Sequence, residues 1–176
     1  MKNVTWPLGL ISGILLLVGS LGPVIGTDGS AGEVQGASLG YLMVLLAAIG
    51  AIVAMVIVAR KNAEVRFIQL IKTGLLTALI TTLVYYVGSV IFYKWVSPDF
   101  LANLREAHIQ KKALTILDVA KRTEYVQSAE ADKSKYVNAF TYSAIQSIIV
   151  FMMCLMPVAI CGYVLFRLRG RKKLAE

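Results

Sequence analysis

Residues 73–100 read TGLLTALITTLVYYVGSVIFYKWVSPDF, and this stretch decides the fold. Its first part, residues 73–96, carries one charge, Lys94, and exceeds the roughly 20 apolar residues that a helix needs to cross a bilayer. The next three residues are typical of a helix start, with Ser97 as N-cap, Pro98 at the first helical position and Asp99 at the positive end of the helix dipole. We therefore expect a membrane span followed by a second helix on the far side of the bilayer.

Three more stretches have the length and composition of a span. They are residues 7–25, 39–59 and 142–166. Hydrophobic residues make up 57% of the chain, against roughly 45–50% in soluble domains. The sequence predicts an all-α, polytopic integral membrane protein with four transmembrane helices in a single membrane domain, residues 1–176. Residues 97–141 form a helical extracytoplasmic segment between the third and fourth spans. We expect the first stretch to be retained as a span, because Pro23 makes a poor signal-peptide cleavage context.

The net charge of +8 lies entirely on one side of this predicted topology. Only Glu64 and Glu176 oppose the basic residues of the N-terminus, the loop between the second and third stretches, and the C-terminus. These basic residues are Lys2, Arg60, Lys61, Arg66, Lys72, Arg167, Arg169, Arg171, Lys172 and Lys173. The positive-inside rule therefore predicts that both termini are cytoplasmic. Anionic lipid headgroups are the expected partner of this charge, and nucleic acid is not, since no aromatic residues interleave a basic groove.

Hydroxyl-bearing side chains recur every four residues in the third stretch, at Thr73, Thr77, Thr81 and Tyr85. One interpretation is a polar lining for a substrate path. The other is that each threonine hydroxyl bonds to the carbonyl four residues earlier and that this face packs against a neighbouring span. We favour packing. A Gly9–Gly13 pair in the first stretch has the spacing that allows close helix approach, although glycine is also common in membrane helices.

The segment of residues 97–141 contains no glycine, and its only proline is Pro98. This composition favours helix throughout, with the polar residues 128–135 as a turn back toward the membrane. Leu104, Leu114 and Leu117 recur near one face and form a stripe too narrow for an independent core. We expect these leucines to contact the span ends, the headgroup region or another protein.

No catalytic or metal-binding constellation stands out. His108 is the only histidine, and a zinc site would need three or four ligands. Met152, Cys154, Met156 and Cys161 could supply soft ligands for Cu(I), but such residues are ordinary membrane-helix fillers. We predict no enzyme activity, no cofactor and no metal. No acidic residue, arginine or histidine lies in the middle of a span, whereas pumps need such groups.

The sequence VRFIQLIKTGLLTALITTLVYYVGSVIFYKWVSPDF, residues 65–100, resembles the central segment of the bacterial domain-of-unknown-function family 4199. The likeness is concentrated at Tyr85, Tyr93, Pro98, Asp99 and Phe100, and the order of elements matches over essentially the whole chain. One departure is that no glycine or proline precedes the last stretch. The resemblance implies a small four-span protein of the bacterial inner membrane, and it brings no activity and no catalytic residue.

Two functions from different classes remain open. The first is an accessory or structural membrane protein that binds a membrane partner, or a second copy of itself, through its spans and residues 97–141. The second is a small-solute or lipid transporter that acts as an oligomer and uses the threonine face. We favour the first. The residues expected to make contacts are Thr73, Thr77, Thr81, Tyr85, Leu104, Leu114 and Leu117.

Overall fold

The structure is a computed structural model that describes residues 2–22, 32–62, 65–131 and 138–173. In this part of the chain every regular element is a helix, and there is no β-strand. The elements, in chain order, are α1 (Lys2–Leu21), α2 (Gly32–Lys61), α3 (Phe67–Ile91), the π-helix η2 (Phe92–Val96), α4 (Phe100–Leu114), α5 (Val119–Ala131) and α6 (Ala139–Lys173).

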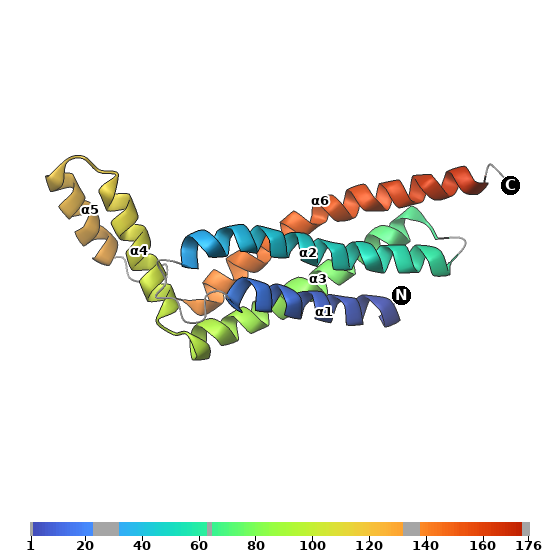
Figure 1. The fold of residues 1–176 in the computed structure, drawn as a ribbon, viewed down its shortest axis with the longest axis horizontal. Helices are drawn as coiled ribbons and strands as arrows, with labels where there is room; N and C mark the ends of the chain where they lie inside the picture. The colour runs from blue at the N-terminus through green and yellow to red at the C-terminus, as the bar shows by residue number, and fades with distance from the viewer. Residues whose placement is uncertain (1, 23–31, 63–64, 132–137, 174–176) are drawn as a thin grey trace.

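The four long helices α1, α2, α3 and α6 lie lengthwise beside one another, and α3 packs against each of the other three (Figure 1). Helices α4 and α5 form a hairpin at one end of this bundle. Both termini and the connection between α2 and α3 lie at the other end. Three clusters of buried apolar residues follow one another along the bundle: an inner one around Met55, a middle one around Ala78 and an outer one around Tyr93.

The long helices begin earlier than the sequence analysis predicts. Helix α1 begins at Lys2, so Pro7 lies inside it and removes only one backbone hydrogen bond, the one to the carbonyl of Asn3. Helix α2 begins at Gly32, so residues 32–38, which precede the predicted span, are helical, while residues 23–31 lie outside the described part.

Helix α3 also begins early, at Phe67. The predicted span begins at Thr73, but residues 67–72 form the first turns of the same helix. The side-chain oxygen of Gln69 accepts the N–H of Arg66 at 3.2 Å, and this bond satisfies one of the free donors at the helix start. The span therefore starts inside the basic region that precedes it.

The predicted helix start at Ser97 is wrong by two residues. The π-helix η2 ends where the Ser97 N–H bonds to the Phe92 carbonyl at 2.9 Å, and a turn follows in which the Phe100 N–H bonds to the Ser97 carbonyl at 3.2 Å. Pro98 occupies the second position of this turn, where proline is favoured. Asp99 is the N-cap of α4 and makes no side-chain cap bond. The serine thus contributes its backbone, not its hydroxyl.

Within the predicted turn at residues 128–135, residues 128–131 are helical and belong to α5, and residues 132–135 lie outside the described part. The chain also reverses at residues 115–118, between α4 and α5, which the sequence did not predict. The Thr115 hydroxyl donates to the Lys112 carbonyl at 2.7 Å, and the Asp118 carboxylate accepts the Ala120 N–H at 2.9 Å. Side-chain bonds of this kind end one helix and cap the next without glycine or proline.

Candidate functional site

The residues predicted to make contacts fall into two places in the structure. Thr73, Thr77, Thr81 and Tyr85 lie on α3 inside the bundle, and all four are buried. Leu104, Leu114 and Leu117 belong to the hairpin or to its turn, outside the bundle. The structure therefore offers two candidate sites with different chemistry.

The threonine face of α3 is fully buried, and its hydroxyls are engaged by backbone carbonyls. Thr73 donates to the Gln69 carbonyl at 2.8 Å, Thr77 to the Thr73 carbonyl at 2.9 Å, and Thr81 to the Thr77 carbonyl at 3.0 Å. These are the bonds to the carbonyl four residues earlier that the packing interpretation requires. The face is packed inside the bundle, and α1 contacts it at Thr81.

Close approach of α1 to α3 depends on the Gly9–Gly13 pair. A Cβ atom added at Gly9 would lie 2.7 Å from the Cβ of Ile80, and one added at Gly13 would lie 2.6 Å from the Cβ of Val84. The approach allows the Thr81 hydroxyl to reach the Gly9 carbonyl across the interface, at 3.2 Å. The two glycines and Thr81 therefore form one helix–helix contact of the small-residue type.

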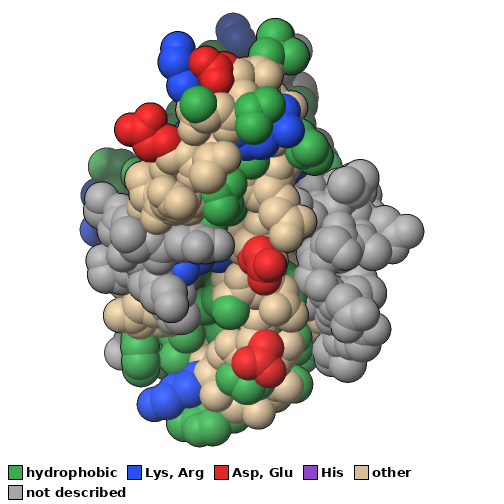
Figure 2. Space-filling model, turned by 90° about the vertical axis from the view of Figure 1, so that its left-hand side faces the viewer, with side chains coloured by type: hydrophobic (Ala, Val, Ile, Leu, Met, Phe, Trp, Pro, Cys, Tyr) green, Lys and Arg blue, Asp and Glu red, His purple; other side chains and the backbone are tan. Residues whose placement is uncertain are grey.

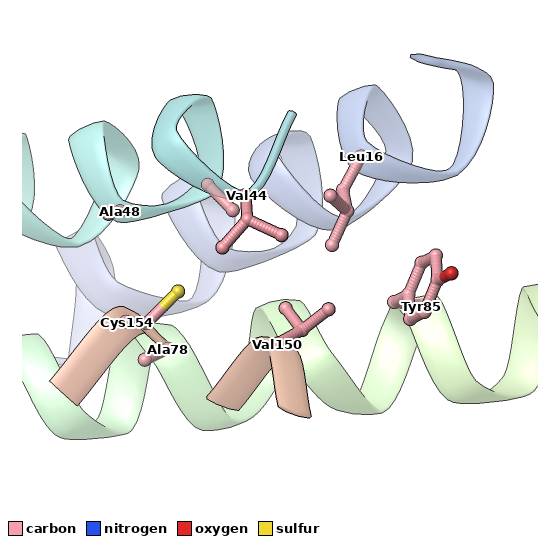
Figure 3. Packing of buried hydrophobic residues seen from close by; sticks show 8 residues of the cluster. Leu16, Val44, Ala48, Ala78, Tyr85, Val150 and Cys154 are labelled. Atoms are coloured by element: carbon pink, nitrogen blue, oxygen red, sulfur yellow. The ribbon is translucent and has the colours of Figure 1, made fainter. Parts of the chain in front are cut away.

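Tyr85 belongs to the middle cluster of the core (Figure 3). Its ring lies opposite Leu16 of α1, on the same side of α3 as Ala78. The other members of the cluster are Val150 and Cys154 of α6 and Val44, Ala47 and Ala48 of α2. The Ser20 side chain of α1 lies close to the phenol group. Tyr85 therefore lies where the four long helices meet.

An aromatic cluster joins the bundle to the hairpin, and its central residue, Tyr93, is buried. Its ring stacks on Phe100 at a centroid distance of 5.6 Å and meets Tyr142 edge-on at 5.4 Å. Leu104 packs against the same cluster. Tyr93 continues the buried row of Thr81, Tyr85 and Ser89 on α3, at the same spacing of four residues.

The turn between α4 and α5 exposes large apolar side chains. Leu114 is 74% exposed, Leu117 is 94% exposed and Val119 is 70% exposed. Val119 was not among the residues predicted to make contacts, because an unbroken helix would place its side chain on another face than those of Leu114 and Leu117. The apolar stripe expected in this segment is therefore divided, with Leu104 packed on the outer cluster and Leu114 and Leu117 presented to the surroundings.

Two serines on α6 are buried without a hydrogen-bond partner among the described atoms. Ser143 and Ser147 lie one turn apart, on the face of α6 that also carries Val150 and Cys154. A buried hydroxyl without a partner is unfavourable, roughly 1–3 kcal/mol from mutational data. This pair is able to hydrogen-bond an uncharged polar group.

The soft-ligand residues of α6 point in different directions. Cys154 is buried in the middle cluster, Cys161 packs on the inner cluster, and Met152 and Met156 are exposed on the outside of the bundle. The described residues contain no group of three or more histidine, cysteine, aspartate or glutamate side chains that could hold a metal ion. His108 lies on the exposed part of α4.

Three of the described helices are long and apolar enough to cross a membrane: Asn3–Leu21, Phe67–Val96 and Ala139–Leu168. The fold is thus that of an all-helical protein whose apolar helices suggest a membrane location. The chain belongs to the family described as "Protein of unknown function (DUF4199)", whose family model matches residues 7–167. This match confirms the resemblance inferred from residues 65–100. No curated protein and no solved structure matches the chain.

Proposed function

We propose that this protein is a multi-pass protein of the bacterial inner membrane, with four spans and both termini in the cytoplasm. Helix α2 is the fourth span of this proposal. It is 30 residues long, it packs against α1, α3 and α6, and residues 39–59 carry no charge. The basic residues Arg60, Lys61, Arg66 and Arg167 lie at the end of the bundle that also holds both termini (Figure 1). The positive-inside rule supports a cytoplasmic position for that end.

We propose further that the protein is an accessory or structural component that binds a membrane partner and has no catalytic role. The buried polar side chains of the described part are all serine and threonine, which favours packing over the proton or ion chemistry of a pump. The threonine face, on which the transport interpretation of the sequence rests, is buried in the bundle, with α1 against it at Thr81. The lipid bilayer covers the outer faces of the spans, and the hairpin is available for a protein.

The observation that carries this proposal is the exposure of Leu114, Leu117 and Val119 on an ordered hairpin outside the bundle. Large apolar side chains that gather on one exposed surface are typical of interaction sites. Chemical crosslinking in native membranes, followed by native gel electrophoresis, tests the proposal. The protein should migrate in a complex larger than its own monomers or dimers, and migration only as monomer in several mild detergents would contradict an accessory role.

A second candidate, a small-solute or lipid transporter acting as an oligomer, is supported by Ser143 and Ser147. Their unpartnered hydroxyls could bind an uncharged polar group inside the bundle. Protein purified alone and placed in proteoliposomes should then give solute flux or lipid scrambling. The Ser143→Ala, Ser147→Ala variant should lose that activity while keeping its fold, because alanine fits where serine does.

A further inference from the structure

We propose that the turn of the hairpin is a docking site for the folded extracytoplasmic part of a partner protein. The partner's binding surface is an apolar pocket with acidic residues at its rim. We name this docking site the hairpin tip and define it as Leu114, Leu117 and Val119 with the flanking Lys111 and Lys121. The inference rests on the accessory function proposed above. It adds the place of contact and the chemistry of the partner.

The hairpin tip is held in shape before any partner binds. The Arg122 guanidinium donates two hydrogen bonds to the Ile116 carbonyl, at 3.1 and 2.8 Å, and so closes the turn. Toward the base, the Arg105 side chain of α4 donates to the Ala129 carbonyl of α5. Apolar side chains on a preformed turn lose little conformational freedom on binding, which favours affinity.

The charges around the hairpin tip select an acidic partner surface. Residues 111–124 contain four basic side chains and only two acidic ones, Asp118 and Glu124. The Asp118 carboxylate is turned to the backbone N–H groups of Ala120 and Lys121, where it caps α5. Lys111 and Lys121 are exposed. A partner that covers the apolar centre would therefore gain from acidic groups at its rim, where charges steer association and fix specificity.

The position of the hairpin tip favours a protein over the chain's own bilayer. Of the described chain, the turn lies farthest from the end that holds the two termini (Figure 1). Figure 2 views the molecule from the hairpin end and shows hydrophobic, basic and acidic side chains together at the top, where the turn lies. In the proposed topology this end stands clear of the outer membrane surface. A second copy is disfavoured, because two hairpin tips meeting face to face would bring their lysines together.

Site-specific photocrosslinking tests the inference in full-length protein in native membranes. Benzoylphenylalanine at position 117 should give an adduct with one protein, and mass spectrometry should place the linked peptide in an extracytoplasmic domain next to acidic residues. Benzoylphenylalanine at Asn103, an exposed position at the base of α4, is the matched control and should not give that adduct.

Two variants then test the chemistry. Leu114→Ser with Val119→Ser should lower the adduct yield about tenfold or more, as loss of central apolar contacts does at interfaces. Lys111→Glu with Lys121→Glu should lower it similarly, while Lys111→Arg with Lys121→Arg should retain it. All four positions are exposed, so the bundle should fold in each variant, and unchanged helix content by circular dichroism checks this. Leu104 is left intact because it packs in the outer cluster.

Each other outcome overturns the inference. An adduct with lipid would make the bilayer the occupant, and an adduct of twice the chain's own mass would make it a second copy. The absence of an adduct would show that the hairpin tip is not a docking site. An adduct yield that charge reversal leaves unchanged would show that the partner surface is not acidic. If the larger complex on native gels persists in both variants with unchanged yield, the accessory function stands and only the docking site fails. If no complex exists at all, the function itself fails.

Discussion

At the scale of single residues, glycine and threonine contribute to the α1–α3 interface in different ways. Gly9 and Gly13 bring α1 against α3, and Thr81 uses that proximity to reach the Gly9 carbonyl. Thr73 and Thr77 share the face but donate only within their own helix. The sequence shows the periodicity of these threonines, but which one bonds across the interface depends on the rotation and height of α1, which the periodicity does not contain.

Replacement of Gly13 by alanine should destabilise the bundle. The added Cβ would lie 2.6 Å from the Val84 Cβ and 3.0 Å from the Thr81 carbonyl oxygen, and neither is the end of a flexible side chain. Overpacking of this kind costs about 1–3 kcal/mol. Unfolding in a mild-detergent and SDS titration should show the loss. The control is Gly22→Ala, where an added Cβ meets nothing within 4 Å. Equal stability of the two variants would contradict the close contact.

Thr81→Val should lower stability more than Thr77→Val. The two substitutions have the same shape change, but only the Thr81 hydroxyl also bonds to α1. Interhelical bonds of this type contribute about 0.6 kcal/mol on average in membranes. The comparison is made by the same unfolding titration. A double substitution of Thr81 by Val and Gly9 by Ala should lose less than the sum of the two single effects, since both disturb one contact.

At the scale of elements, the sequence predicts helices in the apolar stretches well and the junctions between elements poorly. The end of η2 at Val96 and the helical character of most of residues 97–131 follow from composition. The break at residues 115–118 does not, because Thr115 and Asp118 act through hydrogen bonds that compete with the helix. The burial of Tyr93 depends on tertiary contacts, because Phe100 and Tyr142 pack on its ring. Local propensity does not contain such contacts.

The cap at Asp118 should decide whether α5 holds its place in the hairpin. Asp118→Ala removes the acceptor for the Ala120 N–H and should cost about 1 kcal/mol, whereas Asp118→Asn keeps an acceptor and should cost little. Limited proteolysis of the full chain measures the difference, because a loosened turn at residues 115–118 is cut faster. Equal cutting rates for the alanine and asparagine variants would show that the Arg122 bonds alone hold the turn.

At the scale of the whole molecule, the charge distribution and the shape both support the proposed orientation in the membrane. The basic residues of the described part that lie outside the hairpin and the outer aromatic region gather at the end of the bundle with both termini, and the hairpin occupies the other end (Figure 1). Helix α2 decides between topologies. If it crosses the bilayer, α1 and α2 form a pair and the α2–α3 connection returns to the side of the N-terminus. If it does not, the three remaining spans place the N-terminus and the C-terminus on opposite sides of the membrane.

Reporter fusions test this orientation directly. An enzyme reporter that is active only in the periplasm should be silent when fused after Lys61 or after Lys173, and active when fused after Glu124. The reason is the basic excess at the first two sites, which the positive-inside rule holds in the cytoplasm. Activity after Lys61 would remove α2 from the set of spans, and activity after Lys173 would reverse the last helix.

Replacing Arg60, Lys61 and Arg66 together with Gln should then weaken the preference of the α2–α3 connection for the cytoplasmic side. Some reporter activity should appear after Lys61, because three of the charges that retain that connection have been removed.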